Sequence, residues 1–411
     1  MSTLSYAQEI DFLKKPIFSN STELAVQFKK GIGYQLKIIP EDKGTKYKAI
    51  SILKPSKGWD LSTTKEIEAT FKNTGNSPVE IMFWVVGTKG WNAVGKTIQL
   101  KPGERKTSVC DLRATFPDGT HKLDPENIQE LRILTVKAQK EVSFTLESIV
   151  GLGKTSKWKV PKERLLVPDM TLETPKAGKR VLYKLKNTEP SDLYAVLYLP
   201  KNWNPNKKYP VIVEFPGNIF YTEKCYSTGR PEQCVIGYGM TKGEDAIWLS
   251  MPFVNYKTQK IAESGWGNPE DTADYTVKMV KDVIQNFGAD ANNLVITGFS
   301  RGAIACGFIG LRTKEIASLW KGIHACQHYD GDGWGGAKME DAIKRLKNFQ
   351  GKSFFQTDNT KNEEPKKMLK NTNVKTTFVN SGLQAHACDM FLDDRPSTLK
   401  LRKWFQDLIS E

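Results

Sequence analysis

The sequence predicts two structural classes in one chain: an all-β sandwich followed by a mostly parallel, doubly wound α/β sheet. Its 411 residues are about two to three times a typical domain. Up to about residue 150, short apolar or alternating runs are separated by turn residues, with no helical period between them. From residue 180 on, strand patterns alternate with helix patterns. We therefore expect a β-sandwich domain over residues 1–152, a linker rich in Lys, Pro and Thr over 153–179, and an α/β domain over 180–411.

The strands of the first domain follow from period-2 alternation, in which every second side chain faces the core. Predicted strands cover residues 34–39, 67–71, 79–86, 97–100, 131–136 and 142–146. Turn residues end them, as in the Asn-Thr-Gly-Asn run at 73–76 and the Lys-Pro-Gly-Glu run at 101–104. Strands at this spacing predict a sandwich.

The strands of the second domain are short, near-continuous apolar runs, which are typical of strands buried on both faces. Predicted strands cover residues 181–185, 194–199, 210–215, 246–251, 294–297, 322–326, 353–356 and 375–379. A helix begins at Asp271 or Thr272 and ends at Gly288, with apolar residues at spacings of three and four. Further helices are predicted at 302–311, 339–348 and 397–409.

Composition excludes several classes of protein. No run approaches the roughly 18 consecutive apolar residues of a membrane span, and no apolar run of a signal peptide occurs in the first 30 residues. The net charge of +14 is spread over both halves, with 25 Lys and Arg against 17 Asp and Glu in residues 1–160 and 35 against 29 in the rest. We therefore expect no nucleic-acid and no membrane partner. The alternatives are an ordinary basic surface or attraction to an acidic polysaccharide.

Ser300 is the predicted nucleophile. The strand 294–297 runs directly into Gly298-Phe-Ser-Arg-Gly302 and then into a helix of small residues. This is a G-x-S-x-G pattern in the strand-turn-helix context that the chemistry requires. The sharp turn projects the hydroxyl, and glycines at 298 and 302 let neighbouring elements approach.

A serine nucleophile needs a base and an acid, in the chain order serine, acid, histidine. His386 follows the last strand and is the predicted base. Asp358 follows the preceding strand and is the predicted acid. Asp330 and Asp332, which follow the strand before that, are alternatives for the acid; they lack the further ligands of a calcium loop.

The oxyanion of the reaction needs two amide donors. We expect them at Arg301, directly after the nucleophile, and at Asn218, in the loop after the strand 210–215. We also expect the Arg301 side chain to face the pocket and bind substrate, with a buried structural ion-pair role as the alternative. Tyr221 and Trp266 lie on segments long enough to wall that pocket and are further predicted substrate contacts.

Residues 180–411 resemble the α/β-hydrolase superfamily, and within it the carbohydrate esterases of polysaccharide-degrading bacteria. The run Gly298-Phe-Ser-Arg-Gly-Ala303 is similar to the Ser-Arg elbow of glucuronoyl esterases, whose following lysine is replaced here by Ile304 and Ala305. The resemblance implies a serine esterase that uses no metal and no organic cofactor. Its substrate would be a polysaccharide or oligosaccharide carrying acetyl, feruloyl or uronate esters.

The N-terminal domain resembles the galactose-binding-like jelly-roll modules attached to such enzymes. The motifs are Gly58-Trp-Asp-Leu-Ser62, the turn at 73–75, the Leu-Lys-Pro-Gly-Glu run at 100–104 and the strand 144–149. Such modules imply sugar binding or a structural spacer. Trp59, Trp84 and Trp91 are the aromatic residues available for stacking, and Trp84 lies mid-strand, where a core position is the alternative.

Two alternative functions remain open at this point: a hydrolase scaffold that only binds carbohydrate, and a peptidase. A role on polymers predicts a periplasmic or secreted location, with the cytoplasm as the alternative. Six cysteines do not make a disulfide scaffold. Cys225 and Cys234 flank a loop short enough for a bridge, and either a bridge or two buried thiols is expected there.

Overall fold

The computed structural model describes residues 10–19, 24–38, 47–55, 59–87, 92–136, 142–159, 161–185, 192–223, 225–329, 333–360, 366–367 and 369–411. The chain divides into two compact units. Unit 1 extends to Pro161, except for residues 89–91, and also includes Tyr221–Tyr226. Unit 2 comprises the remainder, Lys162–Phe220 and Ser227–Glu411.

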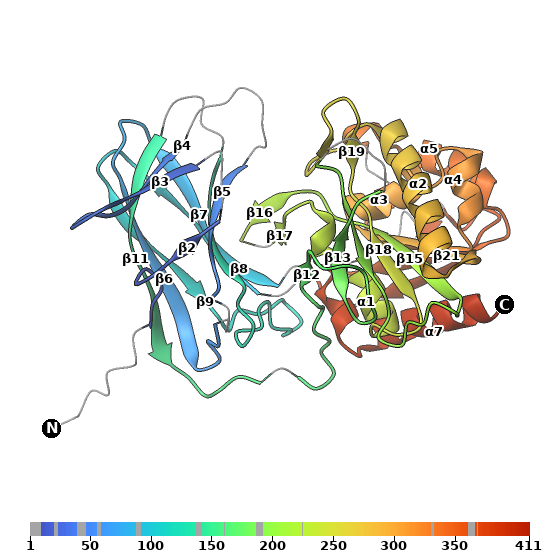
Figure 1. Ribbon diagram of the computed structural model, residues 1–411, viewed down its shortest axis with the longest axis horizontal. Helices are drawn as coiled ribbons and strands as arrows, with labels where there is room; N and C mark the ends of the chain where they lie inside the picture. Colours follow the sequence, from blue (N-terminus) through green and yellow to red (C-terminus); the bar gives the residue numbers. More distant parts are fainter. Residues whose placement is uncertain are drawn as a thin grey trace. The chain divides into compact units, whose positions relative to one another are not determined.

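Unit 1 contains two antiparallel sheets (Figure 1). One has the strand order β3 (Leu24–Lys29), β4 (Gly33–Ile38), β11 (Val142–Lys154), β6 (Thr64–Asn73) and β9 (Arg105–Asp111), and β1 (Ile10–Asp11) also pairs with β11. The other has the order β2 (Ile17–Phe18), β5 (Tyr47–Leu53), β10 (Glu130–Val136), β7 (Val79–Val86) and β8 (Ala93–Leu100). Side chains of both sheets, among them Leu36, Phe71, Phe83 and Phe144, form one buried core. Two sheets around a shared core make the β-sandwich that the period-2 alternation predicts.

Periodicity missed five described strands of unit 1, among them the interior strand β5 and the edge strand β9. In β9, only Ser108 and Cys110 are buried among seven residues. A strand with so little apolar surface carries almost no alternation signal, and it forms because β6 offers it hydrogen-bonding groups along its whole length.

Unit 2 contains one nine-stranded sheet, and six neighbouring strands of it are parallel. Its order is β12 (Met170–Thr171), β13 (Arg180–Tyr183), β14 (Ala195–Tyr198), β18 (Ile247–Ser250), β15 (Tyr209–Phe215), β21 (Ala289–Phe299), β22 (Gly322–Cys326), β23 (Ser353–Asp358) and β24 (Lys375–Asn380). The eight strands predicted for this half are all present, and β12 is added from the segment predicted as a linker. Two short hairpins, β16–β17 (Phe220–Thr222, Cys225–Ser227) and β19–β20 (Val254–Asn255, Lys260–Ile261), leave the loops between strands.

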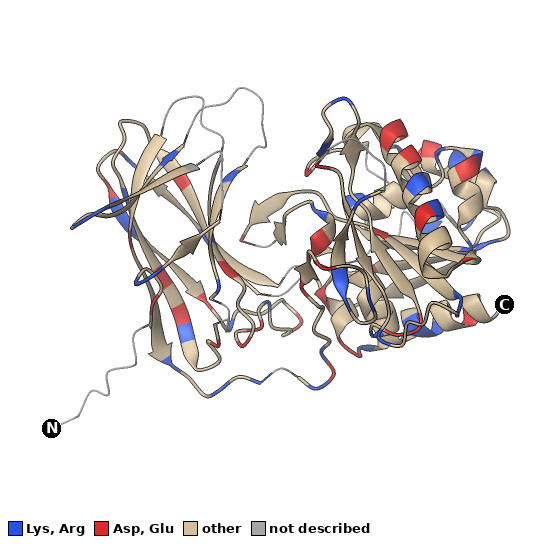
Figure 2. Cartoon of the chain, viewed as in Figure 1, with Lys and Arg blue, Asp and Glu red and all other residues tan. Residues whose placement is uncertain are grey.

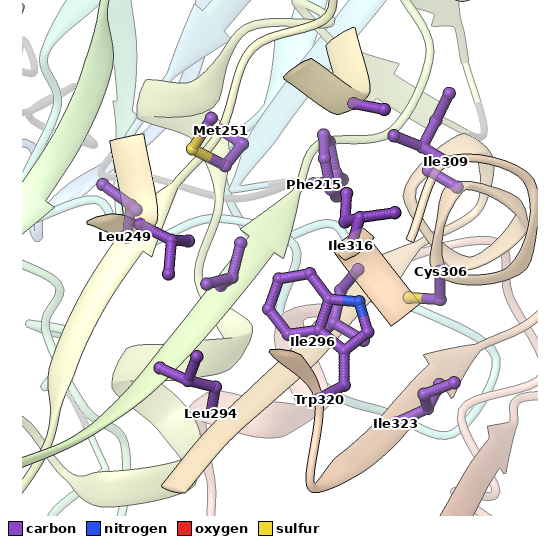
Figure 3. Packing of buried hydrophobic residues seen from close by; sticks show 14 of the residues in the cluster. Phe215, Leu249, Met251, Leu294, Ile296, Cys306, Ile309, Ile316, Trp320 and Ile323 are labelled. Atoms are coloured by element: carbon purple, nitrogen blue, oxygen red, sulfur yellow. The ribbon is translucent and has the colours of Figure 1, made fainter. Parts of the chain in front are cut away.

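Helices cover both faces of this sheet (Figure 1). One face carries α2 (Pro269–Phe287), α3 (Arg301–Phe308), α4 (Lys314–Leu319) and α5 (Met339–Arg345), and the other carries α1 (Ile236–Thr241) and α7 (Pro396–Ser410). Alternate strand residues supply the two faces: Ile296 and Ile323 pack with Cys306, Ile309 and Ile316 of the first group (Figure 3). A sheet covered on both sides in this way is doubly wound, as predicted.

Helix α2 begins earlier than the sequence pattern indicated. Its N-cap is Asn268, whose side chain accepts hydrogen bonds from the Glu270 and Asp271 amides at 2.9 and 3.0 Å. Pro269 occupies the first helical position, where its missing N–H costs nothing. The helix ends, as predicted, at Gly288, which has a φ of 71°.

Basic and acidic side chains are interspersed along the described parts of both units, including α2 (Figure 2). In the part of the chain described, no helix combines the length and the apolar character needed to span a bilayer. All six cysteines are buried free thiols, so Cys225 and Cys234 form no disulfide.

Candidate active site

The backbone at Ser300 has the strained geometry that the sequence motif predicts. Ser300 joins β21 to α3 with a φ of 55° and a ψ of −117°, a region that non-glycine residues rarely adopt. The glycines make the turn possible: a Cβ at Gly302 would lie 2.0 Å from the Phe215 carbonyl oxygen, and one at Gly298 would lie 2.4 Å from Gly302. The first turn of α3 can therefore press against the end of β15, beside the nucleophile.

The structure brings the predicted nucleophile and base together. His386 lies in the loop after β24, and its Nε2 is 3.0 Å from the Ser300 Oγ. The His386 ring also packs on Phe299, with ring centroids 4.7 Å apart. Ser300 and His386 are 86 positions apart in sequence, and the folded sheet brings them together.

The residue at the other ring nitrogen is Gln327, which the sequence analysis did not single out. Its side-chain oxygen is 2.9 Å from the His386 Nδ1. Gln327 follows directly on β22, is almost fully buried, and has a φ of 59°. From this strained turn, the Gln327 side chain extends towards the His386 ring. A glutamine one residue beyond a strand carries no sequence signal for this position, which is normally sought among carboxylates.

Among the described contacts, Nδ1 pairs with Gln327 rather than with Asp358, which the sequence predicts as the acid. Asp358 ends β23, one strand further along, and its Oδ1 accepts a hydrogen bond from the Gln356 amide at 3.0 Å. The Nδ1 contact comes from Gln327, which turns towards the ring directly after β22. The alternatives Asp330 and Asp332 lie outside the described residues.

Asn359, next to Asp358, holds the histidine loop in place. Its side-chain amide donates to the carbonyl oxygens of Ala385 and Ala387 at 3.0 and 2.6 Å, on either side of His386. Its Oδ1 accepts a hydrogen bond from the Ser381 hydroxyl at 2.6 Å. Strand β23 therefore supplies an anchor for the loop.

The environment of His386 favours the neutral imidazole. Burial, and then the charge of the neighbouring His328, lower the pKa of His386 to about 4. The two rings lie 5.1 Å apart. A neutral imidazole at physiological pH is the form that can take a proton from a serine.

The expectation that the Arg301 side chain faces substrate is wrong. This side chain is 1% exposed and donates to four backbone carbonyls, those of Gly217, Gly229, Ala262 and Gly265, at 2.8 to 3.1 Å. Its guanidinium also stacks on Phe253, 3.9 Å from the ring centroid. Burial lowers the pKa of Arg301 to about 9, so it is still a cation at neutral pH. Arg301 organises the loops around Ser300 from within the core.

One of these loops contains Asn218. The Asn218 Oδ1 accepts a hydrogen bond from the Gly265 amide at 3.1 Å, and its Nδ2 donates to the Ile219 carbonyl. The Ile219 amide is bonded to the Glu263 carbonyl at 2.8 Å. The side chain of Asn218 thus braces the loop, and only its backbone amide remains as the predicted oxyanion donor.

Neither aromatic residue predicted to bind substrate is exposed. Trp266 is packed against Phe253, Phe308 and Trp334, and its indole N–H donates to the Gly335 carbonyl at 2.9 Å. Tyr221 belongs to unit 1 and is 4% exposed. The structure therefore does not support a substrate contact for either side chain.

Trp334, which the sequence analysis did not select, is an exposed aromatic residue on the loop after β22. It is 39% exposed and packs on Trp266, with centroids 5.1 Å apart. It lies seven positions beyond Gln327 on the same loop.

Among the described residues, no cluster of three or more His, Cys, Asp and Glu side chains could hold a metal ion. A cavity of about 450 Å³ is lined by α2, Arg312, Thr313, the start of α4 and Arg345. Its lining includes neither Ser300 nor His386, and we do not assign it to the site.

No protein-family model matches this chain, and no curated protein matches it. Several solved structures are similar to this chain. A thermostable esterase is similar over 87% of this chain and 94% of its own, at 12% identity and a TM-score of 0.38. An esterase from Rhizomucor miehei is similar over 57% of this chain and 85% of its own, at 13% identity and a TM-score of 0.36.

A family 11 carbohydrate-binding module from Clostridium thermocellum, in complex with a mixed-linked tetrasaccharide, is similar over 37% of this chain and 91% of its own, at 18% identity and a TM-score of 0.24. This chain spans 36% of the length of another similar structure, that of PfGH50B. At these identities and TM-scores, the function of this chain rests on its own residues.

Proposed function

We propose that this protein is a serine hydrolase that cleaves carboxylic esters of carbohydrates. The observation that carries the proposal is the strained Ser300 at a strand-helix elbow, with its Oγ 3.0 Å from the His386 Nε2. An ordinary turn serine has neither the positive φ nor the base at hydrogen-bonding distance.

In the proposed reaction, the Ser300 Oγ attacks the ester carbonyl while the His386 Nε2 takes its proton. The imidazolium then gives the proton to the departing sugar hydroxyl, which leaves an acyl group on Ser300. Water, deprotonated by His386, releases the acid and regenerates the serine. The backbone amides of Arg301 and Asn218 are the proposed donors to the oxyanion, since the first opens α3 and the second lies in the loop after β15.

Gln327 orients the imidazole in this proposal. Its amide oxygen accepts a hydrogen bond from the Nδ1–H and so keeps Nε2 free to act as the base.

The first test compares wild type with Ser300→Ala on p-nitrophenyl acetate and on acetylated and feruloylated oligosaccharides. The variant should lose on the order of a thousandfold or more in kcat, because it lacks the nucleophile. A fluorophosphonate probe should label wild type and not Ser300→Ala. Equal rates together with no labelling would favour a carbohydrate-binding scaffold, and cleavage in a peptide screen would favour a peptidase.

The carbohydrate part of the proposal is supported by two exposed aromatic side chains on segments that follow strands of the candidate site. Phe220 and Trp334 are 45% and 39% exposed, and they follow β15 and β22, the strands whose ends carry the loops of Asn218 and Gln327. Flat aromatic faces in such positions suit stacking on a sugar ring.

The second test is Trp334→Ala. We expect KM for an acetylated oligosaccharide to rise about threefold to tenfold, because a stacking surface worth about 1 kcal/mol is lost. The rate on p-nitrophenyl acetate should be unchanged, since this ester has no sugar. Leu399→Ala on α7, which removes another exposed apolar side chain (49% exposed), is the matched control. A parallel loss on both substrates would show that Trp334 does not discriminate sugars.

A further inference from the structure

The loop that carries Asn218 continues into a hairpin that belongs to unit 1. Strands β16 and β17 form this hairpin, which we call the arm (Phe220–Ser227). Its central residues, Tyr221–Tyr226, are part of the compact unit 1, whereas Phe220 and Ser227 belong to unit 2. The chain therefore leaves unit 2 two residues after Asn218 and returns at Ser227.

Arg132 of β10 binds both tyrosines of the arm. One of its terminal nitrogens is 3.1 Å from the Tyr221 hydroxyl and 3.2 Å from the Tyr226 hydroxyl. Its Nε donates to the Ser51 hydroxyl at 3.2 Å, and its other terminal nitrogen lies 3.3 Å from a Glu130 carboxylate oxygen. The planar guanidinium can hold both hydroxyls at once because its donors point in fixed directions.

Aromatic packing covers the same region of the sheet. Trp84 of β7 lies 5.0 Å from Tyr226 between ring centroids, and Tyr47 of β5 lies 4.8 Å from Tyr221. Gly95 on β8, opposite Trp84, makes room for the indole, since a Cβ there would lie 2.2 Å from the ring. Trp84 is 3% exposed. The tryptophan that sequence offered for sugar stacking is covered by the arm of its own chain.

The turn of the arm is held by charge as well. Lys96 forms an ion pair with Glu223 at 3.0 Å, and Lys122 donates to the Glu223 carbonyl at 3.4 Å. Both lysines belong to unit 1.

The other end of the arm is held beside the nucleophile. Arg301 donates to the carbonyl of Gly217, before the arm, and to that of Gly229, after it, at 2.8 Å each. Gly217 is the immediate neighbour of Asn218. A displacement of the tyrosines would therefore be transmitted over three or four residues to the proposed oxyanion loop.

We infer that Arg132 is a positioning residue for ester hydrolysis: by holding Tyr221 and Tyr226, it fixes the loop 216–219 that supplies an oxyanion donor. This inference rests on the proposed function.

The test uses three changes in the full chain. Arg132→Ala removes the guanidinium, the double variant Tyr221→Phe with Tyr226→Phe removes only the two hydroxyls, and Arg132→Lys restores a cation. Arg105→Ala is the matched control, because Arg105 is an exposed arginine of unit 1 whose partner is Glu147. Activity is followed on p-nitrophenyl acetate, and hydrogen exchange is followed in peptides that cover residues 216–229.

We expect kcat to fall on the order of tenfold to a hundredfold in Arg132→Ala and in the double variant. KM should stay within about twofold, exchange over 216–229 should rise, and Arg132→Lys should recover part of kcat. The double variant keeps both rings, so it separates positioning from folding if Arg132→Ala proves unstable.

Wild-type kcat and wild-type exchange in the double variant and in Arg132→Ala would overturn the inference. The exchange measurement does not depend on turnover. If the wild-type protein hydrolyses no ester, the proposed function fails, and unchanged exchange would still be needed to refute the coupling of Arg132 to the loop.

Discussion

At the scale of single residues, the unusual feature of the candidate site is a neutral amide at the Nδ1 of His386. A carboxylate in this position orients the ring and also stabilises the imidazolium. Gln327 does the first through its side-chain oxygen, 2.9 Å away, but cannot do the second. The pKa of His386 is lowered to about 4, first by burial and then by the charge of His328.

Gln327→Glu should therefore strengthen the base. A carboxylate beside Nδ1 raises the pKa of His386, so the acid limb of the kcat/KM profile should move to higher pH by about 1 to 2 pH units. The value of kcat at pH 8 should rise on the order of tenfold. A pH–rate series on p-nitrophenyl acetate measures both quantities.

Gln327→Ala is the companion variant. It leaves the ring orientation unsupported and should lower kcat across the whole pH range. An acid limb that stays in place in Gln327→Glu would mean that this side chain does not act on the imidazole.

At the scale of elements, buried arginines tie the loops around the sheet to the core through backbone carbonyls. Arg180 bonds to the carbonyls of residues 231, 232 and 234, and Arg402 bonds to those of residues 239, 391 and 393. Arg301 bonds to four carbonyls from three separate loops. Loops of irregular backbone have carbonyls that no strand satisfies, and one guanidinium can satisfy several of them.

Arg301→Ala should accordingly lower the free energy of unfolding by about 3 kcal/mol, because several buried carbonyls lose their donors at once. Arg301→Lys should recover less than half of this loss, since an ammonium cannot reach four carbonyls in a plane. Urea unfolding measures the effect, with Arg312→Ala as the control, since Arg312 pairs with the exposed Glu270. A stability close to that of wild type combined with a large fall in kcat would instead favour a direct catalytic role for the side chain.

At the scale of the whole molecule, the pH dependence of stability should follow a histidine outside the site. His324 lies on β22, between β21 and β23, and is fully buried. Its Nδ1 is 2.7 Å from the Thr297 hydroxyl and its Nε2 is 3.0 Å from the Thr357 hydroxyl. Burial lowers its pKa to about 3, whereas an unfolded chain has a histidine pKa of about 6.5. The unfolded state therefore binds more protons between these values, and stability is lost as pH falls below about 6.5.

Between pH 7 and pH 5, this one residue should contribute about 2 kcal/mol of lost stability. In His324→Leu, which cannot be protonated at this position, the difference between the free energies of unfolding at the two pH values should shrink by this amount, as measured by urea unfolding. The variant is less stable at pH 7 because two threonine hydroxyls lose a partner, so the comparison is between slopes. An unchanged slope would assign the acid sensitivity to other groups.

Much of the architecture was determined by the sequence on its own. Period-2 alternation, continuous apolar runs and the helix pattern that ends at Gly288 are local patterns, and each records which face of an element is buried. Ser300 was visible for the same reason, because the elbow needs glycines at fixed positions next to one strand and one helix. His386 followed from chain order after the last strand.

Only the tertiary structure decided which side chains meet these two. The Nδ1 partner depends on which strand end turns inward, and a turn with positive φ at Gln327 rather than a carboxylate at Asp358 decides it. Arg301 and Tyr221 are both predicted substrate contacts, yet the Arg301 side chain donates to four buried carbonyls and the Tyr221 hydroxyl is bound by Arg132 of the sandwich. Each of these contacts depends on hydrogen-bond donors and acceptors from distant parts of the chain. The local hydrophobic periodicity of the sequence does not encode them.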